Sequence, residues 1–319
     1  MLDAAAKAFF HTLAGSQTLK RLATRYAMRH PAGPARRFVA GDTLEDAIAA
    51  ARRVEARGLL HTLDYLGESV RNPSESEVAA RQYRRIIETV ARAGIGRNVS
   101  VKLTQLGLDV DRATCIDNLR RILDPAERHA CFVRIDMESS AYTDVTLDIF
   151  ETLWQLGYHN VGIVLQSYLR RSEDDLKRVN GLGARVRLVK GAYNEPPQVA
   201  YQKKADVDAA FVRMMDVLFR EGTYPAIATH DVMLIEEAKQ RAAQIGLPRD
   251  RFEFQMLYGI RRDLQTSLAA EGYRVRIYIP FGREWFPYFM RRLGERPANV
   301  LFLVRGLMQE QRSSSPPSY

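Results

Sequence analysis

Short apolar runs recur along the chain, and each is followed by a polar loop and then by an amphipathic segment. These runs are rich in β-branched residues and are bounded by Gly, Pro, Asn or Asp, which is typical of buried strands. The expected strands cover residues 59–65, 99–103, 131–136, 161–166, 185–190, 226–230, 252–256 and 275–278.

Between the expected strands, apolar residues return at the spacing of one helix face. In the first such segment, residues 43–57, they are Leu44, Ala47, Ile48, Ala51 and Val54. Asp42, followed by Glu45 three residues later, predicts a capping box at the start of this helix, and Gly58 predicts its end. Further helices are expected at 76–93, 144–156, 206–220 and 231–245, and a last large helix carries an arginine pair.

The alternation of strands and helices predicts βαβ units and a parallel sheet. Eight strands at this repeat, in a chain of 319 residues, favour a closed (β/α)8 barrel of the TIM type. The alternative is an open, doubly wound sheet. No GxGxxG follows any expected strand, so the dinucleotide-binding fingerprint of that alternative is missing.

The barrel is expected to occupy residues 38–308. Residues 1–37 have the pattern of amphipathic helices followed by a linker rich in Pro, Gly and Arg. The tail, 309–319, has no apolar pattern and is expected to be disordered. The chain contains no run of about 18 apolar residues, so we expect no membrane-spanning helix.

Composition and charge narrow the class of protein only slightly. Hydrophobic residues make up 46% and charged residues 27%, an ordinary globular balance. The net charge of +9 raises a nucleic-acid-binding function as a hypothesis, but the clustered basic residues and aromatic platform that it requires are missing, so no nucleic-acid partner is expected. We expect no metal site, because Cys115 and Cys131 form no CxxC motif and the histidines form no HxH or HExxH pattern.

Polar or ionisable residues stand at, or one residue past, the ends of several expected strands. They are Lys102, Asp136, Gln166, Lys190, His230 and Gln255. In a barrel these side chains converge on the C-terminal face, where barrel enzymes hold their active sites. The adjacent Arg291 and Arg292 can pair with a carboxylate. Lys190, with Gly191 after it, lets backbone N–H groups approach a phosphate.

These residues predict a barrel enzyme for a small anionic substrate, with a phosphate-bearing cofactor. They leave the reaction open. A redox enzyme fits them, and so does a phosphate-binding isomerase. A non-redox lyase or aldolase that forms a Schiff base at Lys102 or Lys190 fits them as well.

Longer motifs add a resemblance to a known family. The segments VSVKLTQLG, RIDMESS, GIVLQSYLRRS, RVRLVKGAY, AIATHD, FEFQMLYG and RIYIPFG…YFMRRLGERPAN resemble those of proline dehydrogenases, in the family order, over roughly Leu59 to Leu307. The chain is similar to the short monofunctional bacterial type. The resemblance implies a distorted (β/α)8 barrel whose final helix lies over the barrel mouth. It also implies oxidation of L-proline to Δ1-pyrroline-5-carboxylate, reduction of non-covalent FAD and electron transfer to a membrane quinone.

Carried over residue by residue, the resemblance gives catalytic roles to Asp136, near the substrate amine, and to Arg187, at the flavin N5 edge. The implied substrate-binding residues are Lys102, Tyr193, Leu257, Tyr278, Arg291 and Arg292. The implied cofactor-binding residues are Met137, Gln166, Arg187, Lys190, Gly191, Ala192, Thr229 and His230. We also hypothesise that Glu68 forms a gating ion pair with Arg291 when substrate is absent, the alternative being a plain surface glutamate.

The implied quinone lies in the membrane, which bears on where the protein works. The net charge of +9 and the amphipathic N-terminal region favour transient contact with an anionic membrane surface. We therefore expect a cytoplasmic protein with peripheral contact to the inner face of the cytoplasmic membrane.

Overall fold

The computed structural model of the chain describes residues 34–294. Most of the expected N-terminal region, 1–37, and the whole expected tail, 309–319, lie outside the described residues. The last residues of the expected linker, Pro34–Arg37, form a short 3-10 helix, η2, in which Ala35 is buried. In the part of the chain that the structure describes, no helix is long and apolar enough to cross a bilayer.

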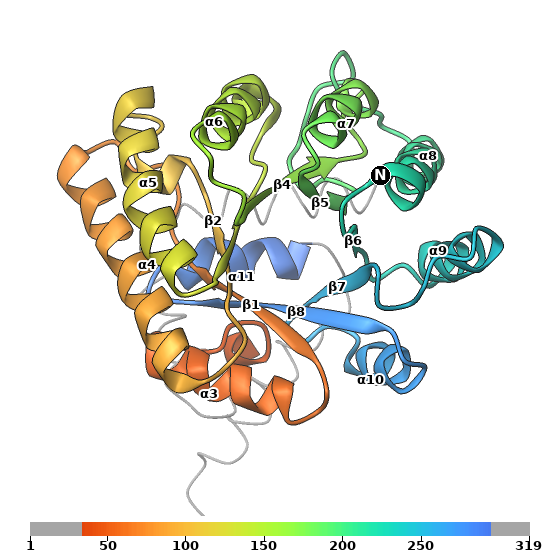
Figure 1. Cartoon of the computed structure of the whole chain (residues 1–319), viewed down its shortest axis with the longest axis horizontal. Helices are drawn as coiled ribbons and strands as arrows, with labels where there is room; N and C mark the ends of the chain where they lie inside the picture. The colour runs from red at the N-terminus through yellow and green to blue at the C-terminus, as the bar shows by residue number, and fades with distance from the viewer. Residues whose placement is uncertain (1–33, 295–319) are drawn as a thin grey trace, which may run out of the picture.

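Eight parallel strands close into a barrel in chain order (Figure 1). They are β1 (Leu60–Tyr65), β2 (Asn98–Val101), β3 (Phe132–Ile135), β4 (Val161–Gln166), β5 (Arg185–Val189), β6 (Ala226–Ala228), β7 (Glu253–Leu257) and β8 (Arg274–Phe281). β1 pairs with both β2 and β8, so the sheet has no free edge. The (β/α)8 barrel is confirmed, and the doubly wound sheet is excluded.

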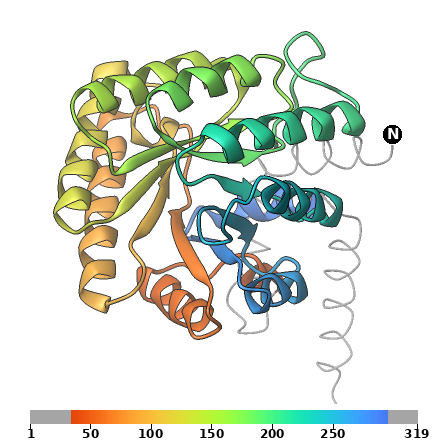
Figure 2. The ribbon, with the colours of Figure 1, turned by 45° about the vertical axis from the view of Figure 1, so that its right-hand side comes forward.

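Helices surround the barrel as a ring in Figure 1. They are α3 (Leu44–Glu55), α4 (Pro73–Ala93), α5 (Arg112–Arg128), α6 (Thr143–Gln155), α7 (Ser172–Gly181), α8 (Lys204–Glu221), α9 (Val232–Gln244) and α10 (Arg262–Ala270). Short 3-10 turns, η3 (Thr104–Leu106) and η4 (Ser140–Tyr142), follow β2 and β3. The turned view shows α8 beside α9 (Figure 2), and the two helices pack together.

Three of these helices, α5, α7 and α10, were not expected from the sequence pattern. α5 contains Pro125, a residue that normally breaks a helical pattern. The cap of α3 was also placed one residue early. Thr43 is the N-cap, and its side chain accepts a hydrogen bond from the Asp46 N–H at 3.1 Å while the Asp46 carboxylate reaches back to the Thr43 N–H. Asp42 and Glu45 therefore do not form the capping box.

The final helix, α11 (Trp285–Gly294), crosses the middle of the ring in Figure 1. Its aromatic residues Trp285, Phe286 and Phe289 pack with Phe38 and Leu66 in a small apolar cluster that is separate from the main core. This packing places the end of α11 over the C-terminal ends of the strands, as the resemblance implied.

Candidate active site

A cavity of about 690 Å³ opens at the C-terminal ends of the strands. Every residue to which the resemblance gave a substrate or cofactor role lines it, from Lys102 after β2 to Arg292 on α11. Glu68 lines a second cavity of about 390 Å³, and Lys102, Tyr288 and Arg291 line both cavities. The topology therefore gathers residues from most of the chain around one space.

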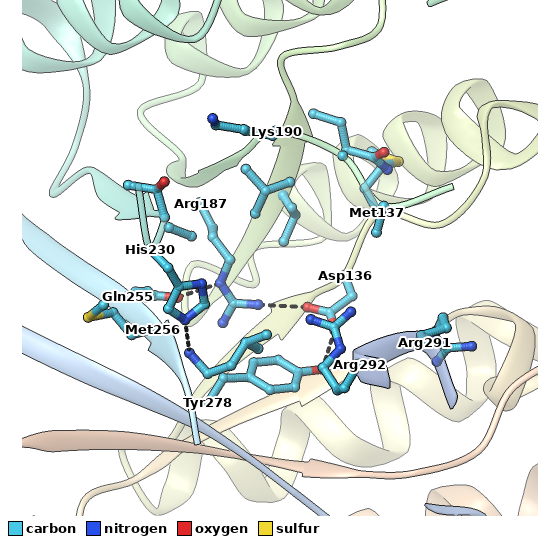
Figure 3. A pocket seen from close by; sticks show the side chains of 18 of the residues that line it. Asp136, Met137, Arg187, Lys190, His230, Gln255, Met256, Tyr278, Arg291 and Arg292 are labelled. Carbon is cyan, nitrogen blue, oxygen red and sulfur yellow. Dashed lines mark hydrogen bonds and ion pairs between the residues drawn. The ribbon is translucent and has the colours of Figure 1, made fainter. Parts of the chain in front are cut away.

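Asp136 lies between Arg187 and Tyr278 in the larger cavity (Figure 3). Its Oδ1 lies 2.8 Å from a terminal guanidinium nitrogen of Arg187, and its Oδ2 accepts a hydrogen bond of 2.7 Å from the Tyr278 hydroxyl. The Lys102 ammonium lies 3.4 Å from the same Oδ2. One carboxylate thus contacts two cations and a phenol at the strand ends, where the sequence predicted that polar side chains would converge.

Asp64 is a partner of Lys102 that was not among the residues expected at the site. It is fully buried on β1, with its Oδ1 3.2 Å from the Lys102 Nζ. Burial by itself would lower the pKa of Lys102, but Asp64, Tyr278 and Asp136 raise it well above its ordinary value. Lys102 is therefore held as an ammonium ion. The sequence feature that could have indicated Asp64 is an acidic residue near the end of an apolar run.

Arg187 is fixed by several contacts. Its Nε donates to the Gln255 amide oxygen, one terminal nitrogen donates to Ser100 at 3.1 Å, and the other contacts Asp136. The guanidinium also lies 5.3 Å from the centroid of the Tyr278 ring. An arginine with each nitrogen engaged keeps one orientation, so its charge points at a fixed place in the cavity.

The arginine pair comes to the cavity from α11. Arg292 is buried, and its guanidinium lies 5.1 Å from the centroid of the Tyr288 ring. Arg291 forms an ion pair of 2.9 Å with Glu68, the contact that we hypothesised from the sequence. Burial would lower the pKa of Arg291, but Glu68 raises it. Two guanidinium groups at one edge of the cavity suit a carboxylate ligand.

The opposite side of the cavity is built by the ends of β4, β5 and β6. Gln166 donates to the Glu138 carbonyl at 2.7 Å, while its own buried amide oxygen has no hydrogen-bond partner among the described residues. Glu138 is itself fixed, because Thr104 donates to its carboxylate through both N–H and hydroxyl. This wall therefore offers an oriented, unused acceptor.

Past β5, the chain bends tightly at Gly191. This glycine has a φ of 123°, and a Cβ there would collide with the ring of Tyr168. The preceding Lys190 forms ion pairs with Asp208 at 2.5 Å and Asp231 at 2.8 Å. The bend brings a cation and backbone amides to the cavity rim, which suits a phosphate group.

After β6, the loop positions Thr229 and His230. The Leu257 N–H donates to Nε2 of His230 at 2.9 Å, so Nε2 is the acceptor and the ring proton is on Nδ1. The Thr229 hydroxyl accepts from the N–H of Asp231 at 3.1 Å. Both residues were expected at the end of the strand and lie just past it.

Comparisons with known proteins identify the family of the chain. The model of the proline dehydrogenase family matches residues 47–305. The chain belongs to the proline dehydrogenase family. It is 40% identical to proline dehydrogenase 1 of Bacillus subtilis strain 168, over 94% of this chain and 98% of that protein. It is 44% identical to the proline dehydrogenase of Deinococcus radiodurans, over 86% of this chain and 90% of that protein.

The bifunctional relatives in this family are longer than this chain. The protein PutA of Escherichia coli K12 is 28% identical over 84% of this chain and only 24% of its own length. Among solved structures, proline utilization A from Bdellovibrio bacteriovorus, inactivated by N-propargylglycine, has a TM-score of 0.76 at 28% identity, covering 82% of this chain and 32% of that one. These matches confirm the family and the fold.

Proposed function

We propose that the protein oxidises L-proline to Δ1-pyrroline-5-carboxylate, reduces a non-covalently bound FAD and passes the electrons to a membrane quinone. One observation carries the proposal. A single cavity joins an arginine pair suited to a carboxylate, a rigid Arg187–Asp136 floor and a glycine bend beside Lys190. Family membership supports the reaction on proline.

The substrate side follows from charge and size. Arg291 and Arg292 would pair with the proline carboxylate, and Tyr193, Leu257 and Tyr278 would pack around the pyrrolidine ring, since all of them line the cavity. Asp136 would face the substrate amine. Because Arg187 and Tyr278 already fix this carboxylate, it would orient the amine with little further rearrangement.

The cofactor side also fits its proposed occupant. The unused Gln166 oxygen would accept a hydrogen bond from the flavin, and Met137 would lie against the ring system. Lys190, Gly191 and Ala192 would contact the phosphate and ribityl part, and Thr229 and His230 the adenosine end. Arg187 would place positive charge beside the flavin. When bound, FAD supplies the acceptor for the hydride that leaves the substrate carbon.

A Schiff-base lyase is the alternative, and the structure offers it little support. The nucleophile of such an enzyme is a neutral amine. Lys102 is held as an ammonium ion by two carboxylates, and Lys190 is paired with two others. Borohydride treatment with a carbonyl substrate would leave a covalent mass increase on a Schiff-base lysine, and we expect none.

The decisive test is the visible spectrum of the purified protein, recorded under anaerobic conditions before and after L-proline is added. We expect a flavin band near ~450 nm that bleaches with proline. A yellow protein that does not bleach would reject proline as the substrate. A colourless protein that also fails to take up FAD would reject the flavin.

Glu68 would act as a gate for the substrate. Glu68 lines the smaller cavity and pairs with Arg291, which lines both cavities, and the same arginine would have to turn toward the proline carboxylate. Glu68→Ala should therefore change the rate of proline binding, measured by stopped-flow bleaching of the flavin. Unchanged binding kinetics and affinity would make Glu68 an ordinary surface residue.

Quinone reduction would take place at the membrane, with the protein otherwise in the cytoplasm. The net charge of +9 supports transient attraction to anionic lipid. Co-sedimentation with vesicles that contain anionic phospholipid, at low salt, tests this attraction, with neutral vesicles as the control. If the protein never sediments with the anionic vesicles, the membrane contact is wrong.

A further inference from the structure

The loop after β5 reaches across to the segment after β3 through one side chain. Glu195 lies just past the Lys190–Tyr193 stretch, and its Oε1 accepts a hydrogen bond of 2.7 Å from the Ser140 N–H. Its other carboxylate oxygen accepts from the hydroxyl of the same Ser140. Both oxygens of one carboxylate therefore hold one residue at the start of η4.

The other side of this loop is fastened by backbone contacts. The Tyr168 N–H donates to the Lys190 carbonyl at 2.9 Å, and the Tyr201 N–H donates to the Tyr168 carbonyl at 2.8 Å. Leu169 and Ala200 form an isolated bridge. These contacts tie the loop to the end of β4, whereas Glu195 ties it to the end of β3.

Burial does little to hold the tip of the loop. Residues 194 and 196–199 are exposed, and only Glu195 among residues 194–199 is partly buried. A segment without buried apolar groups opens easily unless hydrogen bonds hold it. The tethered loop carries Gly191 and Ala192, and its anchor Ser140 follows Met137 at the end of β3, two strands away from β5 in the barrel. Both strand ends line the cofactor side of the cavity.

We propose that Glu195 is a positioning residue that closes the β5–α8 loop against the β3 segment and so holds the cofactor wall in its binding shape. This inference rests on the proposed function, because it takes FAD as the ligand of that wall. Glu195 itself does not line the cavity, so it acts through Gly191, Ala192 and Met137. Its loss should weaken FAD binding and leave the carboxylate clamp of Arg291 and Arg292 in place.

The test is the affinity of the FAD-free protein for added FAD, followed by quenching of flavin fluorescence. Glu195→Ala removes two hydrogen bonds to a charged acceptor, and we expect the Kd for FAD to rise about 10-fold. Glu195→Gln should stay within about 3-fold of the parent protein, because its amide oxygen can accept from the Ser140 N–H and its amide nitrogen can donate to the Ser140 hydroxyl.

Ser140→Ala should have an intermediate effect, since it keeps the N–H contact and loses the hydroxyl contact. In the double variant, adding Glu195→Ala to Ser140→Ala should raise the Kd for FAD only by the effect of losing the remaining N–H contact, because the two residues form one interaction. Glu88→Ala, on the exposed face of α4, is the matched control and should leave the Kd unchanged. With FAD at saturation, the kcat of Glu195→Ala should recover to within about 2-fold.

The outcomes separate the two proposals. If the parent protein does not bind FAD, the proposed function fails. If the parent binds FAD and Glu195→Ala binds it equally well, the Glu195 inference fails while the function stands. Equal losses in Glu195→Gln and Glu195→Ala would also overturn the hydrogen-bond tether. Thermal unfolding of each FAD-free variant shows whether the variant is folded. If Glu195→Ala is not folded, the Kd of Ser140→Ala for FAD tests the tether instead.

Discussion

The interior of the barrel and the layer outside its strands are built from different chemistry. Outward-facing strand residues such as Val101, Ile135 and Ile163 are fully buried against the helices in one continuous apolar core. Most of the side chains that meet inside the barrel are polar or charged, although barrel interiors are usually filled by branched apolar residues. The apolar outer layer therefore stabilises the fold, and the polar interior orients the side chains of the candidate site.

Inside the barrel, the polar side chains form one hydrogen-bonded column. Arg187 contacts Gln255, Gln255 donates to Glu253, and Glu253 binds Arg276 through two contacts of 2.7 and 2.9 Å. A buried polar network rigidifies a protein only where its members find partners. The column runs from the depth of the barrel up to Asp136, so it fixes the geometry of the candidate site from below.

The largest effect that we expect is a loss of activity when Arg187, which connects this column to Asp136, is replaced. Arg187→Met should lower kcat for proline oxidation about 10³-fold, because it removes an oriented charge from the proposed site of reaction. The outer layer is untouched, so the free energy of unfolding, measured with urea, should change by less than about 2 kcal/mol. Arg187→Lys keeps the charge but cannot make the three contacts, and it should remain severely impaired.

The matched experiment in the outer layer should give the opposite result. Leu119, on α5, is fully buried in the apolar core. Leu119→Ala should lower the free energy of unfolding by about 2–5 kcal/mol, through lost burial and the cavity left behind. At a temperature where the variant remains folded, its kcat should be unchanged. A large loss of kcat in the folded variant would mean that the two layers are not independent.

The same division explains how much of the fold could be predicted from the sequence. Apart from His61 on β1, the outward-facing strand residues are apolar, so the strand pattern survives in segments such as Arg185–Val189, where lumen arginines alternate with Val and Leu. Helices were harder to predict where polar residues dominate, as in α7 and α10. Strand ends were misplaced by one to three residues, as at β6 and β8.

The site could be predicted as a set of strand-end residues, but not as a set of contacts. Parallel strands must end on one face, so Lys102, Asp136 and His230 had to come together. That Lys102 meets Asp64, or that Glu195 reaches Ser140 across 55 positions, depends on register and on loop paths, which leave no local pattern. The roles carried over from the family remain predictions for the experiments above.

The smallest effect we expect comes from a titratable residue in the apolar layer. His61 is buried on β1, with its Nδ1 3.3 Å from Glu55 on α3. Burial lowers the pKa of His61 from 6.5 to about 4, against the raising effect of Glu55. Between these values the unfolded chain binds more protons than the folded one. His61 therefore makes the protein less stable as the pH falls from 6.5 toward 4.

This acid-dependent loss should amount to roughly 2–3 kcal/mol across the window. Urea unfolding of the parent protein and of His61→Asn, at several pH values in this range, measures it as a difference in slope. His159→Asn, on the exposed surface, is the control and should keep the slope of the parent. Equal slopes in the parent and in His61→Asn would show that His61 does not contribute to the acid dependence of stability.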